Sequence, residues 1–281
     1  MGSVYHVKNM MSNRVWITIA IGLAMLLGSC SSYEKLLKSR DHELMYQKAL
    51  EYYAIGNHYR YTTLFELISP IYRGTQRADT IEFYLARGHY NQGDYLLAGH
   101  YFNQFRRNFP RSVFTEEATY MYAYCYYRAS PRPLLDQEPT RNAIAAFNEF
   151  FMRYPNSKHR EEANVLLAEL KEKLEERAFL SAKLYFDMGE YKAAIPALKN
   201  SLQDYPNSKY REEQLFLIFQ ASYLLADNSI PSLKRQRFQN TMDEYFNLIS
   251  EFPNTKYLRE AQRIHASVAR AIGTPVRDQE E

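Results

Sequence analysis

Four segments of this 281-residue chain repeat one pattern: an aromatic residue, a proline, any residue, and a serine or threonine. They begin at Phe109, Tyr154, Tyr205 and Phe252, and their prolines lie 45, 51 and 47 residues apart. Proline ends a preceding helix because it lacks the backbone N–H and clashes with the previous turn. The hydroxyl is a suitable N-cap for the next helix. The pattern therefore predicts successive helix–turn–helix units.

The helix before each proline carries a second regularity. Twelve residues before the proline stands a small or short residue, and the residues eight and four before it are mostly large. The small positions are Ala98, Ala143, Ala194 and Thr241. Residues at this spacing share one helix face, and a small one lets a neighbouring helix approach closely. Gly93 and Gly189 each precede a tyrosine by two residues, which predicts tight turns with a left-handed glycine between paired helices.

These positions resemble the tetratricopeptide repeat, a two-helix unit of about 34 residues. The resemblance implies an all-α, tetratricopeptide-like α-solenoid of about five helix pairs plus a terminal helix at 256–272. Inserted segments at 130–139 and from 228, with one long helix at 160–188, explain the wider spacing. The first pair is expected at 41–73. Because Tyr61 stands where the repeat usually has alanine, the alignment of this pair with the repeat is not fixed by the sequence. We expect the solenoid at 41–272 and a flexible tail at 273–281.

Residues 1–29 have the features of a secretory signal peptide. A basic segment precedes an apolar run at 15–27, which at about 1.5 Å per residue is too short for a bilayer core of about 30 Å. The following Leu27-Gly28-Ser29-Cys30 resembles a bacterial lipobox, which implies cleavage before Cys30 and a covalent lipid on its thiol. An ordinary signal with a chance cysteine is the alternative. We expect residues 30–40 to form the lipidated amino terminus and tether.

Lipidation would place the mature protein at a membrane. The lipobox resemblance implies three acyl chains on Cys30, more than the two signals that stable anchoring needs. Ser31, the second mature residue, is typical of sorting to the outer membrane, and we expect the periplasmic face. Loss of Lys8 and Arg14 lowers the formal net charge from +3 to +1. The charge therefore gives no indication of nucleic-acid binding.

The sequence has no recognisable catalytic or metal-binding motif. His42-Glu43 begins like a zinc-protease helix, but Tyr46 stands where the second histidine ligand would be. Only two cysteines are present, which excludes a disulfide framework. Cys125 is expected to be a small buried hydrophobe, and the basic segment 234–237 a solvated helix start. We expect a protein that is not an enzyme and holds no cofactor beyond the lipid.

Tyrosine is unusually frequent, at 25 residues. In the tetratricopeptide register, the first helix of each pair lines a concave face. The candidate residues for a peptide-binding groove on that face are Tyr46, Tyr53, Phe83, Arg87, Tyr90, Tyr120, Tyr124, Tyr127 and Arg128. Tyrosine and arginine dominate binding hot spots because they combine apolar area with polar groups. The alternative is that about half of these side chains pack between helices.

The lipobox at Cys30, the five repeats and the Tyr-Pro-Asn-Ser segments at 154–157 and 205–208 together resemble the BamD family. These are tetratricopeptide lipoproteins of outer-membrane β-barrel assembly, and the resemblance covers nearly all of residues 33–272. It implies a scaffold that binds a BamA-like barrel subunit and other assembly-machinery lipoproteins. Its amino-terminal repeats would receive unfolded outer membrane protein precursors. A SusD-like nutrient-binding lipoprotein, disfavoured by the short chain, and another tetratricopeptide adaptor of the cell envelope are the alternatives.

Overall fold

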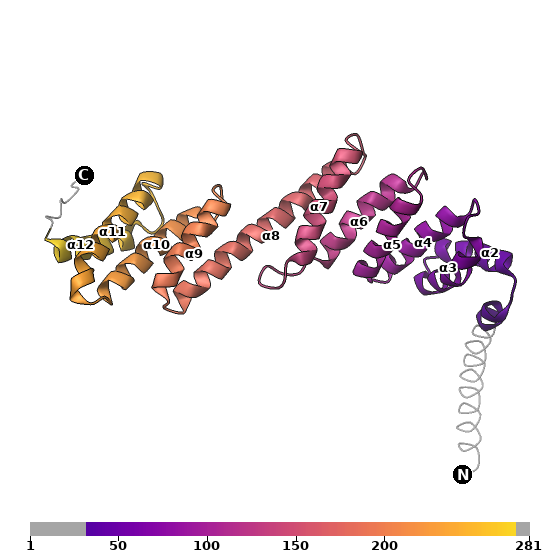
Figure 1. Ribbon diagram of the computed structural model, residues 1–281, viewed down its shortest axis with the longest axis horizontal. Helices are drawn as coiled ribbons and strands as arrows, with labels where there is room; N and C mark the ends of the chain where they lie inside the picture. Colours follow the sequence, from indigo (N-terminus) through magenta and orange to yellow (C-terminus); the bar gives the residue numbers. More distant parts are fainter. Residues whose placement is uncertain (1–31, 274–281) are drawn as a thin grey trace, which may run out of the picture. The chain divides into compact units, whose positions relative to one another are not determined.

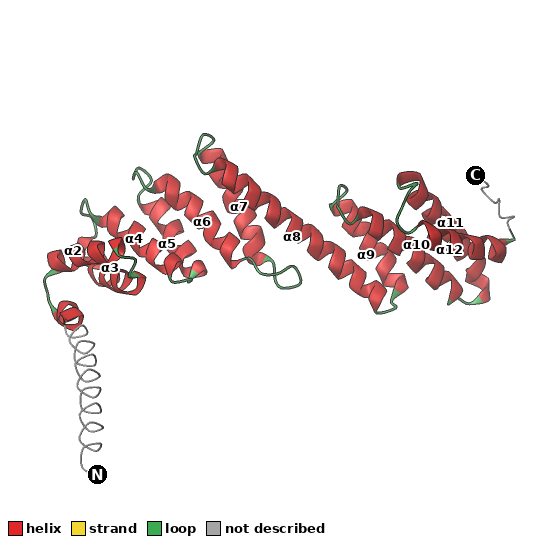
Figure 2. Cartoon of the chain, turned by 180° about the vertical axis from the view of Figure 1, so that it is seen from behind, coloured by secondary structure: helices red, strands yellow, loops and turns green. Residues whose placement is uncertain are grey.

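The computed structural model describes residues 32–273, which form helices joined by turns and loops, with no β-strand in that range (Figure 2). A short helix at 32–38 precedes eleven longer ones, which follow one another as five pairs and a final helix (Figure 1). The predicted all-α, tetratricopeptide-like architecture is therefore confirmed for the described residues. The predicted signal peptide, Cys30, Ser31 and the tail at 274–281 lie outside them.

The chain divides after Arg128 into two compact units. The first unit contains α2 (His42–Ala54), α3 (His58–Tyr72), α4 (Ala78–Asn91), α5 (Tyr95–Asn108) and α6 (Thr115–Ala129), whose last residue belongs to the second unit. The second unit contains α7 (Glu138–Arg153), α8 (Arg160–Asp187), α9 (Tyr191–Asp204), α10 (Arg211–Asp227), α11 (Pro231–Glu251) and α12 (Leu258–Ile272). The predicted long helix corresponds to α8, which has 28 residues.

The turns between paired helices have the predicted left-handed glycines. Gly93 follows α4 with φ +87°, and Gly189 follows α8 with φ +79°. The residue after each glycine donates its backbone N–H back into the helix, from Asp94 to the His89 carbonyl and from Glu190 to the Tyr185 carbonyl. These bonds satisfy carbonyl groups that the helix end leaves without partners. Each turn thereby reverses the chain and starts the second helix of the pair.

The small positions of the repeat are buried where helices cross. Ala98, Ala143, Ala194 and Thr241 are all fully buried. The large residues four positions later on the same face include Phe102, Phe147 and Leu198, which are fully buried too. Burial of such a side chain stabilises a fold by about 1.5–3 kcal/mol. The regular core of each pair therefore follows from the pattern that precedes each proline.

In the first helix pair, a glycine of the next pair makes room for the large residue Tyr61. Tyr61 of α3, which stands where alanine is usual, is completely buried. A Cβ atom added at Gly88 of α4 would overlap the hydroxyl oxygen of Thr62 and would lie 2.9 Å from Cε2 of Tyr61. Gly88 therefore leaves the space that the tyrosine ring occupies. Asn91, one turn further along α4, donates to the Tyr61 hydroxyl over 3.1 Å.

The repeated hydroxyl has a different role from the predicted N-cap. In the second unit, Ser208 and Thr255 lie three residues before α10 and α12, whose N-cap positions are Tyr210 and Tyr257 and have no side-chain cap. Each hydroxyl accepts the backbone N–H two residues later, over 3.0 Å and 3.2 Å. The hydroxyl therefore caps the short turn that precedes the helix and not the helix itself, because the helix begins three residues later.

The same hydroxyls connect neighbouring repeats. Ser208 donates to Glu175 over 2.8 Å, and Thr255 donates to Glu212 over 2.7 Å. The following backbone N–H groups, from Lys209 and Lys256, reach the same carboxylate oxygens over 3.0 Å. In the first unit, Ser112 donates to Asp79 over 2.8 Å. We call each hydroxyl–carboxylate pair a latch, because it ties a turn to the helix one repeat earlier.

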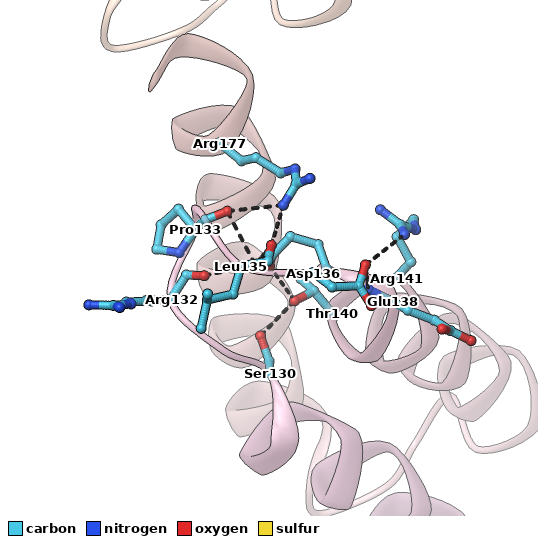
Figure 3. A network of polar contacts seen from close by, with 10 residues as sticks. Ser130, Arg132, Pro133, Leu135, Asp136, Glu138, Thr140, Arg141 and Arg177 are labelled. Atoms are coloured by element: carbon cyan, nitrogen blue, oxygen red, sulfur yellow. Dashed lines mark hydrogen bonds and ion pairs between the residues drawn. The ribbon is translucent and has the colours of Figure 1, made fainter. Parts of the chain in front are cut away.

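The inserted loop before α7 is held by polar side chains (Figure 3). Gln137 is fully buried, and its side-chain amide donates to the carbonyls of Arg132, Pro133 and Leu135 over 2.9–3.3 Å. From α8, Arg177 donates to two of these carbonyls. Buried carbonyls without donors are unfavourable, so this network gives the loop a defined conformation. Helix α7 begins at Glu138 rather than at the expected Thr140, because Pro139 is tolerated in the first turn.

Candidate functional site

A stack of tyrosine rings runs along one face of α6. Tyr120, Tyr124 and Tyr127 lie one helical turn apart, so that their side chains share a face. The Tyr120 and Tyr124 rings are 5.7 Å apart with an interplanar angle of 20°, and the Tyr124 and Tyr127 rings are 5.6 Å apart at 21°. Ring pairs at this separation attract each other beyond the area that they bury. The spacing along α6 therefore gives an ordered aromatic surface.

Arg128 joins this stack to the preceding helix pair. Its guanidinium donates to the hydroxyl of Tyr90 over 3.3 Å and to that of Tyr95 over 2.6 Å. It also lies over the Tyr95 ring, 4.6 Å from the centroid. The Tyr90 ring in turn is 6.0 Å from that of Tyr124. We call Tyr90, Tyr95, Tyr120, Tyr124, Tyr127 and Arg128 the tyrosine cluster.

The surroundings of Tyr90 favour the neutral form of its phenol group. Burial raises the pKa of Tyr90, and the nearby Tyr124 raises it further, against the smaller effect of Arg128. A neutral phenol both donates and accepts hydrogen bonds. Arg87 is half-buried and pairs with Glu117 over 3.3 Å, which ties α4 to α6 beside the cluster. The cluster can therefore offer ring faces, hydroxyl groups and one exposed guanidinium to a ligand.

Three of the nine predicted groove residues differ from the expectation because they belong to the packed interior. Tyr46, Phe83 and Tyr120 are buried. Tyr46 packs against Phe65 and Tyr72 beneath the guanidinium of Arg77. Phe83 stacks on Phe114, 4.5 Å between centroids. These rings fill the space between helices, which was the alternative interpretation of the pattern.

The other six predicted residues retain some exposure, and their role in a groove stays a prediction. Tyr53 is half-buried, with its ring 4.5 Å from that of Tyr84 on α4. Arg87, Tyr90, Tyr124 and Tyr127 are also half-buried, and Arg128 is exposed. The structure brings four of the six, Tyr90, Tyr124, Tyr127 and Arg128, into the cluster. Tyr53 lies with Tyr84 on the earlier helices.

Two tyrosines that contact the predicted groove residues, Tyr95 and Tyr84, were not predicted from the sequence. Tyr95 begins α5, and the repeat pattern indicated only that it follows the turn glycine Gly93 by two residues. Its contact with Arg128 joins residues 33 positions apart, and no local spacing predicts such a pair. Tyr84 stands beside Phe83 on α4, facing Tyr53 and Phe65. The shared helix face of Tyr84 and Arg87, three residues apart, was the available signal.

The described residues contain no cluster of three or more His, Cys, Asp or Glu side chains that could hold a metal ion. Burial raises the pKa of the Cys125 thiol to about 12, so the group stays a protonated thiol at neutral pH and is a poor nucleophile. Its predicted burial is confirmed. None of the described helices is both long enough and apolar enough to cross a membrane.

Comparison with known proteins supplies the family. A profile of the family YfiO, described as outer membrane lipoprotein, matches residues 38–236. The outer membrane protein assembly factor BamD of Neisseria meningitidis serogroup B is 22% identical over 264 residues, 89% of this chain and 95% of its own. BamD of Neisseria gonorrhoeae is 23% identical, over 73% of this chain and 82% of its own. BamD of Caulobacter vibrioides is 22% identical, over 73% of this chain and 67% of its own.

Among solved structures, the TPR2AB domain of yeast Sti1 in its pHSP90 complex aligns with 81% of this chain and 98% of its own. Its sequence identity is 13% and its TM-score 0.38. At that score, the assignment of the fold rests on the helix pairs themselves. The profile match covers most of the solenoid and crosses both compact units. The chain belongs to the YfiO family of outer membrane lipoproteins.

Proposed function

We propose that this chain is a lipid-anchored scaffold of outer-membrane β-barrel assembly, at the periplasmic face of the outer membrane. The observation that carries the proposal is the similarity to proteins named outer membrane protein assembly factor BamD, which extends over 89% of this chain and 95% of one relative. The anchor is the predicted lipid on Cys30. The proposed role is binding rather than catalysis, with a BamA-like barrel subunit and other assembly-machinery lipoproteins as partners.

We further propose that the tyrosine cluster binds unfolded outer membrane protein precursors. Such a ligand is an extended chain in which apolar and polar side chains alternate, with aromatic residues near the strand ends. Stacked phenol rings offer apolar area with little loss of side-chain entropy, and their hydroxyl groups can bond an exposed peptide backbone. Tyr124 and Tyr127 are the central candidates because they keep some exposure while Tyr120 supports them from below.

The experiment is crosslinking of the purified protein to peptides from the carboxy terminus of a β-barrel precursor. Tyr124→Ala with Tyr127→Ala should weaken binding about tenfold or more, as expected for hot-spot tyrosines. Tyr59→Ala is the matched control, because Tyr59 is an exposed tyrosine of the same unit outside the cluster. Unchanged crosslinking in a folded double variant would reject the cluster as the peptide site.

The partner is tested separately, by affinity purification from native outer membranes. We expect recovery of a barrel subunit of the BamA type with this protein. Recovery of a sugar transporter of the porin type, without any barrel-assembly subunit, would reject the scaffold function and favour the nutrient-binding alternative. The two experiments can fail independently, because the affinity purification uses the wild-type protein and does not depend on peptide binding by the tyrosine cluster.

A further inference from the structure

The start of the described chain folds back on the first helix pair and forms a groove there. Leu36, in the helix at 32–38, is buried in the core of the first unit. Tyr33 packs edge-on against Tyr52 of α2, 5.8 Å between centroids, and the guanidinium of Arg60 lies 4.8 Å from the Tyr33 ring centroid. The helix at 32–38 is therefore held to the first pair by both apolar and polar contacts.

Between this helix and α2 lies an open cavity of about 780 Å³, which we call the amino-terminal groove. Its lining residues include Ser32, Leu36, Leu44, Tyr52, Ala54 and Ile55. Ile55 has 74% of its surface exposed and Leu44 43%, so the groove presents apolar side chains to solvent. Lys35, Lys48 and Glu51 also line it, and Lys48 pairs with Glu51 over 2.6 Å. Sites for small apolar ligands typically have volumes of about 300–1,000 Å³.

The position of the groove along the chain indicates its occupant. Ser32 lines the groove, and the predicted lipid-bearing Cys30 is two residues earlier. Two residues of extended chain reach at most about 7 Å. A group attached to Cys30 is thus tethered at the mouth of an apolar groove, and a short tether gives a high effective concentration. Three acyl chains are expected on Cys30, while two suffice for stable anchoring.

We infer that the amino-terminal groove binds one acyl chain of the lipid carried by Cys30. The inference rests on the proposed lipid anchor and adds where one of its chains lies. The remaining two chains stay in the bilayer. Because the groove is built from the helix at 32–38 and α2, the bound chain fixes the first helix pair against the membrane surface. The lipid anchor then fixes the orientation of the first unit, which would otherwise rotate freely about its point of attachment.

The experiment is photo-crosslinking in cells supplied with a fatty acid that carries a diazirine, which the lipoprotein acyl chains incorporate. After irradiation, the full-length protein is purified and its peptides are identified by mass spectrometry. We expect the lipidated amino-terminal peptide to be crosslinked to peptides that contain Leu44 or Ile55. Ile55→Asp should reduce these crosslinks about tenfold or more, because a carboxylate is unfavourable in an apolar site. Leu97→Asp, at an exposed leucine of α5 outside the groove, should leave them unchanged.

The other outcomes separate the inference from the anchor on which it rests. Lipid on Cys30 without crosslinks to the groove peptides overturns the inference and leaves the anchor intact. No lipid on Cys30 overturns both. Cys30→Ser abolishes the tethered occupant, so crosslinks to Leu44 or Ile55 that persist in this variant mean that a membrane lipid fills the groove, which also overturns the inference. Circular dichroism of each variant checks that the helices are retained.

Discussion

Thr255 shows how a single side chain serves two repeats. It is buried, it accepts the N–H of Tyr257 to close its own turn, and it donates to Glu212 in α10. Glu212 lies in the first turn of α10, where an acidic side chain complements the helix dipole. In α10 that acid also receives the latch from the next repeat. The latch therefore couples the stability of α12 to that of α10.

Thr255→Val should lower the free energy of unfolding by about 1.5 kcal/mol, because a hydrogen bond to a charged group is lost at constant side-chain shape. Urea denaturation followed by circular dichroism measures the change. Thr255→Ser restores the residue of the other three repeats and should retain most of the stability. In a Glu212→Gln background, Thr255→Val should cost less, since the charged acceptor is already absent. Equal costs in both backgrounds would show that the latch does not couple the two residues.

His89 is a buried titratable residue whose surroundings oppose its charge. Its ring stacks on Tyr101 at 4.8 Å with an interplanar angle of 3°, and Nε2 lies 3.3 Å from a carboxylate oxygen of Glu66. Burial lowers the pKa of His89, and this effect outweighs the opposite effects of Glu66 and Asp94. The 3.3 Å contact does not meet hydrogen-bond geometry, since Nε2 has no hydrogen-bond partner. Desolvation of the charged imidazole therefore determines the direction of the pKa shift.

This shift predicts the sign of a pH dependence. Because the pKa of His89 is lower in the folded state, the unfolded chain takes up a proton first as the pH falls below about 6.5. Stability should be greatest above that pH and decline as the solution is acidified. His89→Phe keeps the stacking and should flatten the decline between pH 7.5 and 5.5, although the pKa of His265 is also lowered by burial. The same replacement at exposed His100 is the control, and an unchanged slope in His89→Phe would contradict the assignment.

At the scale of helices, local patterns predicted most of the architecture. The prolines at 110, 155, 206 and 253 follow the ends of α5, α7, α9 and α11, because proline acts on its own preceding turn. The carboxylate partners of the latches could not be predicted, because Glu175 is 33 residues from Ser208 and nothing local relates them. Likewise, Phe83 was expected in a groove, and only the packing of Phe114 against it shows that its face of α4 is buried.

The loop before α7 gives the element-scale prediction. Gln137→Leu preserves volume but removes the donor shared by three loop carbonyls. Amide hydrogen exchange at 132–136 should become about tenfold faster, as expected when about 1.4 kcal/mol of local stabilisation is lost. Exchange within α8 should not change. Gln203→Leu, at an exposed glutamine of α9, is the control. Unchanged loop exchange would mean that Arg177 holds the loop without Gln137.

At the scale of the whole molecule, fold and location depend on different parts of the chain. The described helix pairs bury their large residues in cores within each unit. The proposed attachment to the membrane depends instead on the predicted lipid on Cys30. The described helices offer no membrane span that could replace it. A change at Cys30 should therefore separate location from folding.

Cys30→Ser should leave the circular dichroism and the thermal unfolding of the protein unchanged but move it from the membrane fraction to the soluble fraction after cell lysis. The reason is that acyl chains provide the anchoring free energy, at about 0.8 kcal/mol for each buried methylene group. Cys125→Ala is the matched control: it removes the other cysteine, which is buried in α6, and should keep the protein in the membrane fraction. If Cys30→Ser stays with the membrane after washing at high salt, the attachment comes from protein partners and not from the lipid.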